Sequence, residues 1–253
     1  MQKRKPSKRS NNVYELTEAL LANGRASDEG PKRKSWSAHD LRKVKAMTPN
    51  QSIMFDYYRD GFNVIGHGSA GTGKTYCALY LALEDMLSES STIENITIIR
   101  SAVQGRDIGF LPGTEQEKMA VYELPYVDIV AQLLGKPNSY QDMKDAGKMT
   151  FTSTSFIRGL TWDNTVVIID EAQNMTLHEL DSIVTRVGKN TKLLVCGDTK
   201  YQQDLKKDSS GLTSLIYIMN KMNQCQVVEF NHDDIVRSKF VREWIVAREK
   251  SGL

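Results

Sequence analysis

The chain has 253 residues, of which 40% are hydrophobic and 25% are charged. That length and balance predict one sizeable, globular α/β domain with its own core. No apolar run approaches the roughly 18 residues that a membrane-spanning helix needs. The basic N-terminus lacks the apolar stretch of a secretory signal. We therefore expect a cytoplasmic protein with no membrane partner.

The formal net charge of +2 hides an asymmetry between the first 45 residues and the rest. Residues 1–45 contain 12 Lys or Arg against 5 Asp or Glu, whereas the remainder contains 21 against 26. We predict a basic, flexible arm over residues 1–45, with one helical stretch at residues 14–21, and a single domain over residues 46–253. The arm either holds a polyanion electrostatically or is a solvated tail that aids solubility.

The chain contains three cysteines, Cys77, Cys196 and Cys225. Their wide spacing fits neither a zinc site nor a disulfide framework. Cys77 and Cys196 lie in apolar surroundings, and we expect them to be small core residues in a reducing cytosol. The four histidines share no metal-like spacing either. The sequence therefore predicts no metal centre built from cysteine or histidine.

From Thr48 onward, strand and helix patterns alternate along the chain. This alternation predicts an α/β fold, a mostly parallel sheet with helices on both faces. The short apolar runs predict strands at residues 62–65, 96–99, 149–152, 166–169, 193–196 and 226–230. The longer periodic segments predict helices at residues 52–59, 75–83, 115–134, 177–185, 210–222 and 237–250.

The first of these strand and helix pairs flanks the sequence GSAGTGKT, a full match to the phosphate-binding pattern G-x-x-x-x-G-K-[ST]. Glycines let backbone N–H groups wrap around a phosphate chain without Cβ clashes, and the following helix directs its N-terminus at the anion. Lys74 is expected to reach the β- and γ-phosphates, and the Thr75 hydroxyl to bind Mg²⁺. The predicted phosphate-binding residues are Gly68, Ser69, Ala70, Gly71, Thr72, Gly73, Lys74 and Thr75.

The continuous apolar strand at residues 166–169 ends in two acids, Asp170 and Glu171. Ligands of parallel sheets bind beyond the carboxyl ends of the strands, so both side chains should point at the phosphates. We predict that Asp170 holds Mg²⁺, directly or through water, and that Glu171 orients or activates the attacking water. The alternative is a pair of surface acids that cap the next helix.

Other polar residues are further candidates for this site. Asp198 follows the strand at residues 193–196, where it either senses the γ-phosphate or belongs to a simple turn. Arg186 and Arg237 are catalytic candidates to offset phosphate charge, either one acting in trans as an arginine finger, or they form surface salt bridges. Gln51 either reads the adenine edge through its amide or is an ordinary residue at a helix N-terminus.

Together these motifs resemble the PhoH-like ATPase family, a branch of P-loop proteins close to superfamily 1 helicases. The resemblance covers roughly residues 48–250, nearly all of the chain beyond the arm. Its order of motifs is far more specific than a P-loop alone. Besides the P-loop it rests on IRSAV (99–103), GFLPG (109–113), FIRGLT (156–161), DEAQN (170–174), TRVG (185–188), GD (197–198) and DIVR (234–237).

The resemblance implies a RecA-like P-loop domain that binds and hydrolyses ATP with Mg²⁺, forms a ring-shaped homo-oligomer, a hexamer, and acts on RNA or single-stranded DNA. Phage genomes often encode stand-alone proteins of this kind, so the chain resembles those of phages. The family pattern Gly-Asp-x-x-Gln-x-Asp-Leu corresponds here to a segment one residue longer. In that segment Gln202 is the candidate for the family's nucleotide-binding glutamine, and the family's proline after the strand-end arginine is Ser101.

Three functions are therefore compatible with the sequence. The first is an oligomeric, helicase-like ATPase motor on RNA or single-stranded DNA. The second is a P-loop ATPase that couples ATP to assembly or to a protein partner without strand separation. The third is a small-molecule kinase, for which residues 101–164 offer no acceptor-pocket motif. A superfamily 1 motor uses two RecA-like domains and this chain holds one, so translocation would require neighbouring subunits.

Overall fold

The computed structural model of the protein describes residues 36–101, 115–199 and 210–251. Within these residues, six strands form one sheet in the order β3-β2-β4-β5-β1-β6, and every neighbouring pair is parallel. The strands are β1 (Asn63–Gly68), β2 (Asn95–Arg100), β3 (Met149–Ser153), β4 (Thr165–Asp170), β5 (Lys192–Gly197) and β6 (Cys225–Phe230). All six strand predictions are confirmed, with ends that shift by a few residues.

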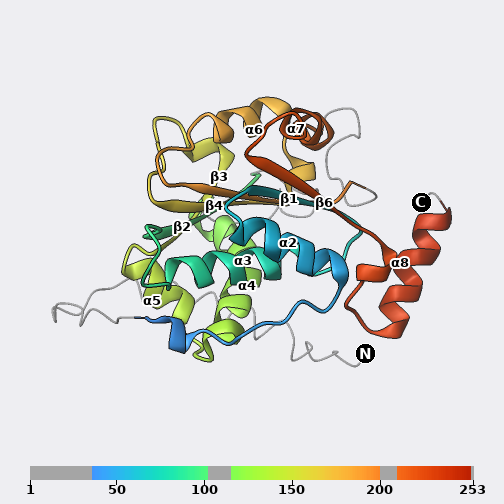
Figure 1. Ribbon diagram of the computed structural model, residues 1–253, viewed down its shortest axis with the longest axis horizontal. Coiled ribbons are helices and arrows are strands. Elements are labelled where there is room, and N and C mark those ends of the chain that lie inside the picture. The colour runs from blue at the N-terminus through green and yellow to red at the C-terminus, as the bar shows by residue number, and fades with distance from the viewer. Residues whose placement is uncertain (1–35, 102–114, 200–209, 252–253) are drawn as a thin grey trace, which may run out of the picture.

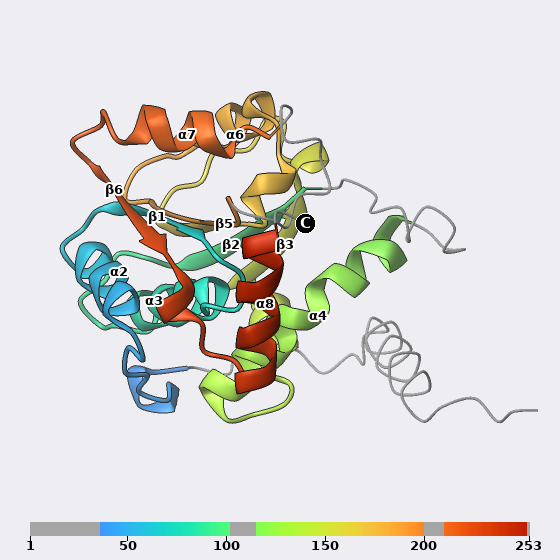
Figure 2. The same ribbon diagram turned by 90° about the vertical axis from the view of Figure 1, so that its right-hand side faces the viewer.

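Helices cover both faces of the sheet (Figure 1). On one face lie α2 (Pro49–Arg59), α3 (Lys74–Met86), α4 (Glu115–Leu134) and α5 (Ser139–Asp145), and on the other lie α6 (Leu177–Val184) and α7 (Leu212–Met219). The last helix, α8 (Lys239–Ser251), crosses the end of the sheet where the strands finish (Figure 2). The predicted α/β class, a mostly parallel sheet with helices on both faces, is confirmed.

Short 3-10 turns join several of these elements, at η1 (Ala38–Asp40), η2 (Thr154–Phe156), η3 (Ala172–Asn174) and η5 (His232–Asp234). The sequence did not predict these turns, nor α5. Among the helices of the described residues, none has the length and apolar character to cross a membrane. The helix predicted at residues 14–21 lies outside the described residues.

The core consists of two apolar layers, one on each side of the sheet. In β4, which is buried at every position, Val166 and Ile168 pack toward α3 and α4, whereas Val167 and Ile169 pack toward α6 and α7. Successive side chains of a strand point to opposite faces, so a strand covered on both sides must be apolar throughout. The three cysteines are free and buried within these layers, which confirms the core positions predicted for Cys77 and Cys196 and adds Cys225.

The last ten residues of the predicted arm, 36–45, lie against the domain. Leu41 is buried in the core layer, and the Arg42 backbone N–H donates to the Leu133 oxygen at 2.8 Å. Asp40 forms a partly exposed ion pair with Lys136 at 3.1 Å. This segment therefore follows the end of α4 before the chain enters α2.

Candidate functional site

The loop between β1 and α3 contains glycines in left-handed backbone conformations. Gly71 and Gly73 have φ angles of +73° and +82°. At Gly68, with φ of +118°, a Cβ atom would lie 2.0 Å from the backbone oxygen of Phe230, so only glycine fits where β1 approaches β6. The loop leads directly into α3, and its backbone N–H groups and the helix N-terminus favour an anion at this position.

Lys74 lies over this loop. Its Nζ donates to the backbone oxygens of Gly68 at 3.0 Å and Ser69 at 2.7 Å. Burial lowers the pKa of Lys74, while the neighbouring acids, of which Asp198 has the largest effect, act in the opposite direction. The Ser69 Oγ atom is buried and has no hydrogen-bond partner in the described part of the chain. Such a loop fits a ligand that would complete its polar groups.

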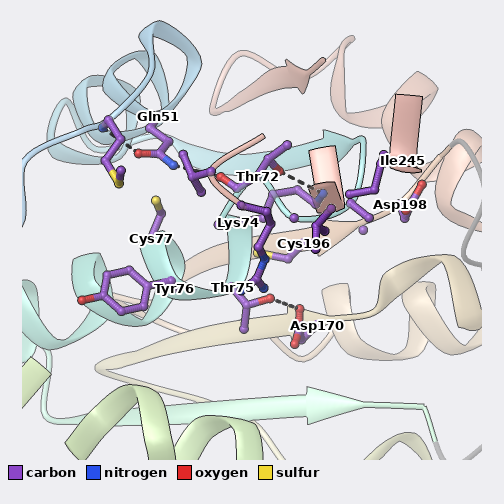
Figure 3. A pocket seen from close by; sticks show the side chains of 18 of the residues that line it. Gln51, Thr72, Lys74, Thr75, Tyr76, Cys77, Asp170, Cys196, Asp198 and Ile245 are labelled. Carbon is purple, nitrogen blue, oxygen red and sulfur yellow. Dashed lines mark hydrogen bonds between the residues drawn. The ribbon is translucent and has the colours of Figure 1, made fainter. Parts of the chain in front are cut away.

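The first turn of α3 meets the end of β4. The Thr75 hydroxyl donates a hydrogen bond to Asp170 Oδ1 at 2.8 Å, although the two residues are 95 positions apart (Figure 3). A hydroxyl that donates its proton keeps lone pairs for a metal, and Mg²⁺ prefers oxygen ligands. Thr75 and Asp170 therefore fit the Mg²⁺ site that the sequence predicts.

Glu171 follows in a left-handed backbone conformation, with φ of +53°, which is uncommon for a residue other than glycine. Burial and the adjacent Asp170 carboxylate raise the pKa of Glu171, with Arg100 acting in the opposite direction. Strained backbone and a raised pKa both cluster at functional sites. A carboxylate of this kind beside a phosphate loop suits the acceptance of a proton from water.

Gln173 connects Glu171 to the end of β5, a role that the sequence did not predict. Its amide N–H binds the Glu171 carboxylate, and its Oε1 accepts the backbone N–H of Asp198 at 2.9 Å. Gln173 is 1% exposed, so this bridge is shielded from water. The structure thus places Asp198 beside the other acids, and its action as a phosphate sensor stays a prediction.

A cavity of about 750 Å³ opens over the loop. Arg237 lines it from the same chain and packs so closely on the loop that a Cβ at Gly71 would lie 3.0 Å from Arg237 Cγ. The backbone N–H of Val236 also donates to the Gly71 oxygen at 3.0 Å. Helix α8 adds part of the cavity wall, with Val241, Trp244, Ile245 and Arg248.

Arg186 lies in a different environment. Its Nε donates to the Ile157 oxygen at 3.0 Å, and its Nη1 donates to the Ser182 oxygen. Arg186 is not among the described residues that line the cavity of its own chain. Its action in trans stays a prediction, and Gln202 lies outside the described residues.

Gln51 of α2 holds the phosphate loop in place through its side-chain amide. Its Oε1 accepts the backbone N–H of Met47 at 2.8 Å, and its Nε2 donates to the Thr72 oxygen at 2.9 Å. The sequence did not predict these two hydrogen bonds. Gln51 also lines the cavity, and a side-chain amide has a second N–H and further lone pairs, so adenine recognition stays a prediction.

Tyr126 of α4 is a site residue that sequence reasoning missed. Its hydroxyl donates to Asp170 Oδ2 at 2.8 Å, and the residue is 1% exposed. The helix at residues 115–134 was predicted, but no motif marks one tyrosine within it. Only the packing of α4 against the sheet brings this hydroxyl to the end of β4.

The glycine loop, its lysine and the paired Thr75 and Asp170 on a parallel sheet define the chain as a P-loop NTPase. A model of the PhoH-like protein family matches residues 43–249. The chain therefore belongs to the PhoH-like protein family, which confirms the resemblance seen in the sequence.

Relatives include the PhoH-like protein of Mycobacterium leprae (strain TN), 32% identical over 212 residues, which cover 82% of this chain and 60% of that protein. The PhoH-like protein of Bacillus subtilis (strain 168) is 34% identical over 191 residues, covering 75% of this chain and 59% of that protein. The chain thus spans about 60% of the length of these relatives. Among solved structures, the large terminase of a thermophilic bacteriophage has a TM-score of 0.46 and 14% identity, covering 78% of this chain and 49% of that one.

Proposed function

We propose that the chain binds ATP with Mg²⁺ and hydrolyses the nucleotide. The observation that carries this proposal is the 2.8 Å contact between Thr75 Oγ1 and Asp170 Oδ1, which sets a hydroxyl and a carboxylate beside the phosphate loop. Family membership supports nucleotide binding. The preference for adenine rests on Gln51, whose amide is held at the edge of the cavity.

In this proposal each residue has a distinct task. The backbone N–H groups of residues 70–75 and the Lys74 ammonium bind the β- and γ-phosphates. Thr75 and Asp170 hold Mg²⁺, which when bound neutralises charge on the phosphate oxygens. Glu171 accepts the proton of the attacking water, and Arg237 offsets negative charge on the phosphates from within the same cavity.

The decisive experiment is Glu171→Gln. We expect hydrolysis to fall by about 10²–10⁴-fold, the usual contribution of a general base. Affinity for a fluorescent ATP analogue should stay close to that of the wild type. Glu84→Gln, on the partly exposed surface of α3, is the matched control and should leave turnover unchanged. If Glu171→Gln retained its turnover, Glu171 would not be the group that accepts the proton of the attacking water.

We propose further that hydrolysis is coupled to RNA or single-stranded DNA in a homo-oligomer. The basic segment 1–45, with 12 Lys or Arg against 5 Asp or Glu, supports an electrostatic contact with a polyanion. The described residues hold a single parallel sheet, so movement along a strand would require a second subunit. Sedimentation showing a fully active monomer would contradict the oligomer.

The loop that follows β3, residues 155–161, is our candidate for the nucleic-acid contact. Phe156 is 57% exposed and Leu160 is 44% exposed, with Arg158 exposed between them. Ile157, in contrast, is 1% exposed and anchors the loop in the core. An exposed aromatic ring and an arginine beside it suit the stacking of unpaired bases.

Hydrogen bonds attach this loop, and Thr154 just before it, to α6 and to Arg186 shortly after that helix. Arg186 holds the Ile157 oxygen, and the Thr154 hydroxyl donates to Glu179 Oε1 at 2.7 Å. The other oxygen of the same carboxylate accepts the Thr176 backbone N–H at 2.8 Å, in the capping box that starts α6. Because α6 begins a few residues after Glu171, these contacts would couple a nucleic-acid strand bound at the loop to the segment that carries Glu171.

The test is ATP turnover with and without a uridine homopolymer or single-stranded DNA, over a series of salt concentrations. We expect a stimulated rate that falls as salt rises. Phe156→Ala and Arg158→Ala should weaken the stimulation while basal turnover persists, and Tyr217→Ala, an exposed aromatic residue on α7, should not. If turnover ignores both nucleic acids while ATP changes the sedimentation, the function is coupling to assembly instead.

A further inference from the structure

We propose that Tyr126 is a positioning residue that sets the orientation of the Asp170 carboxylate for Mg²⁺. This inference rests on the proposed function of the site. Asp170 is 6% exposed, and each of its carboxylate oxygens accepts a hydroxyl proton. Thr75 donates to Oδ1 and Tyr126 donates to Oδ2, both at 2.8 Å. The carboxylate is therefore held from the phosphate loop on one side and from α4 on the other.

The position of the Tyr126 hydroxyl is fixed by packing. Its ring lies 5.5 Å from the ring of Phe151 in β3, in a tilted arrangement. One helical turn earlier, the Tyr122 ring lies 4.9 Å from the guanidinium of Arg100. Arg100 ends β2 in direct register with Asp170 at the end of β4. Two tyrosines on one face of α4 thus hold the ends of two neighbouring strands.

This arrangement decides which oxygen of Asp170 faces the site. With Oδ2 bound to Tyr126, Oδ1 is the oxygen turned toward Thr75 and the loop. Without the Tyr126 hydroxyl, the carboxylate would lose one of its two donors in a buried place, and Thr75 alone would hold its orientation. Partners that orient a metal-ligating group typically change metal affinity by about 10–100-fold when they are removed.

The experiment compares Tyr126→Phe with wild type by titrating Mg²⁺ against the binding of a fluorescent ADP analogue. The phenylalanine keeps the ring that packs on Phe151, so we expect a folded protein with unchanged nucleotide affinity in the absence of Mg²⁺. The Mg²⁺ concentration at half saturation should rise by roughly tenfold, the lower end of the range for such partners. The Mg²⁺-dependent rise in melting temperature with ADP gives a second readout that requires only folded protein.

Tyr140→Phe is the matched control. Tyr140 is also 1% exposed, and its hydroxyl donates to the Glu123 carboxylate at 2.8 Å, but this pair lies between α5 and α4 away from the cavity. An unchanged Mg²⁺ requirement in Tyr126→Phe, or equal increases in both variants, would overturn the inference. A wild type whose nucleotide binding ignores Mg²⁺ would overturn the proposed function as well, so the two failures are distinguishable.

Discussion

The two edges of the parallel sheet hold carboxylates whose surroundings shift their pKa values in opposite directions. At the edge where the strands begin, Asp85 of α3 accepts hydrogen bonds from Ser91 at 2.6 Å and Tyr58 at 2.9 Å and pairs with Lys192 at 2.8 Å. Burial alone would raise the pKa of Asp85, but the hydrogen bonds from Lys192, Ser91 and Tyr58 outweigh it and hold the pKa below its usual value. At this edge, the ionised Asp85 carboxylate therefore stabilises the folded state at neutral pH.

At the edge where the strands end, burial and Asp170 raise the pKa of Glu171, and the Glu171 backbone is left-handed. An acid with a lowered pKa favours the folded state at neutral pH, whereas an acid with a raised pKa opposes it. The carboxylate at the edge where the strands begin therefore stabilises the folded state. The carboxylate at the edge where the strands end destabilises it, and this is the edge where the chemistry is expected. Four substitutions test this difference.

The largest effect should come from Asp170→Asn at the functional edge. We expect hydrolysis to fall by at least about 100-fold, because charge stabilisation of a transferred phosphoryl group typically depends on the metal and its ligands. Unfolding by urea should change little, since the asparagine oxygen still accepts from one hydroxyl and its NH2 group can donate to the other. Turnover near the wild-type level would contradict the assignment of Asp170.

Asp85→Asn at the opposite edge should show the reverse. We expect a loss of about 1–3 kcal/mol in the free energy of unfolding at neutral pH, because the Lys192 ammonium loses its charged partner in a partly buried place. Since the folded-state pKa is lowered, this contribution is present above the unfolded pKa of about 3.9 and disappears as pH falls through the folded value. Urea unfolding at neutral pH and near pH 3 measures the change, while turnover of the folded variant should match wild type.

Glu171→Gln should have a smaller and opposite effect on stability. Because the folded-state pKa of Glu171 is raised, wild type loses stability as pH rises above the unfolded pKa of about 4.3. The glutamine variant lacks this loss, so its melting temperature without nucleotide should exceed that of wild type at pH 8 and approach it near pH 4. A constant difference across that range would contradict the pKa direction.

The smallest effect should come from the surface pair Arg59 and Glu84. Their ends are 2.9 Å apart, but the side chains are 47% and 35% exposed. Exposed ion pairs contribute about 0–1 kcal/mol, so Glu84→Gln should scarcely change the unfolding midpoint. A loss as large as that of Asp85→Asn would show that charge neutralisation in general, and not the buried Asp85 network, carries the stability.

The outcomes at particular residues show how far the sequence could be interpreted. Lys74, Thr75, Asp170 and Asp198 meet in one cavity, as predicted, because a P-loop and strand-end residues on a parallel sheet share one edge. The two arginines could not be distinguished in advance. Arg237 lines the cavity, whereas Arg186 is held by backbone oxygens of its own chain, and this depends on how α6 and α8 pack.

The sequence by itself determined the P-loop, the buried strand that ends in two acids, and the alternation of strands and helices, because each is a local pattern of neighbouring residues. Only the tertiary structure decided that Tyr126 reaches Asp170 across 44 positions and that Gln173 bonds to the backbone of Asp198. The physical reason is that these contacts form between elements distant in the chain, once burial of apolar surface has fixed α4 on the sheet and β5 beside β4.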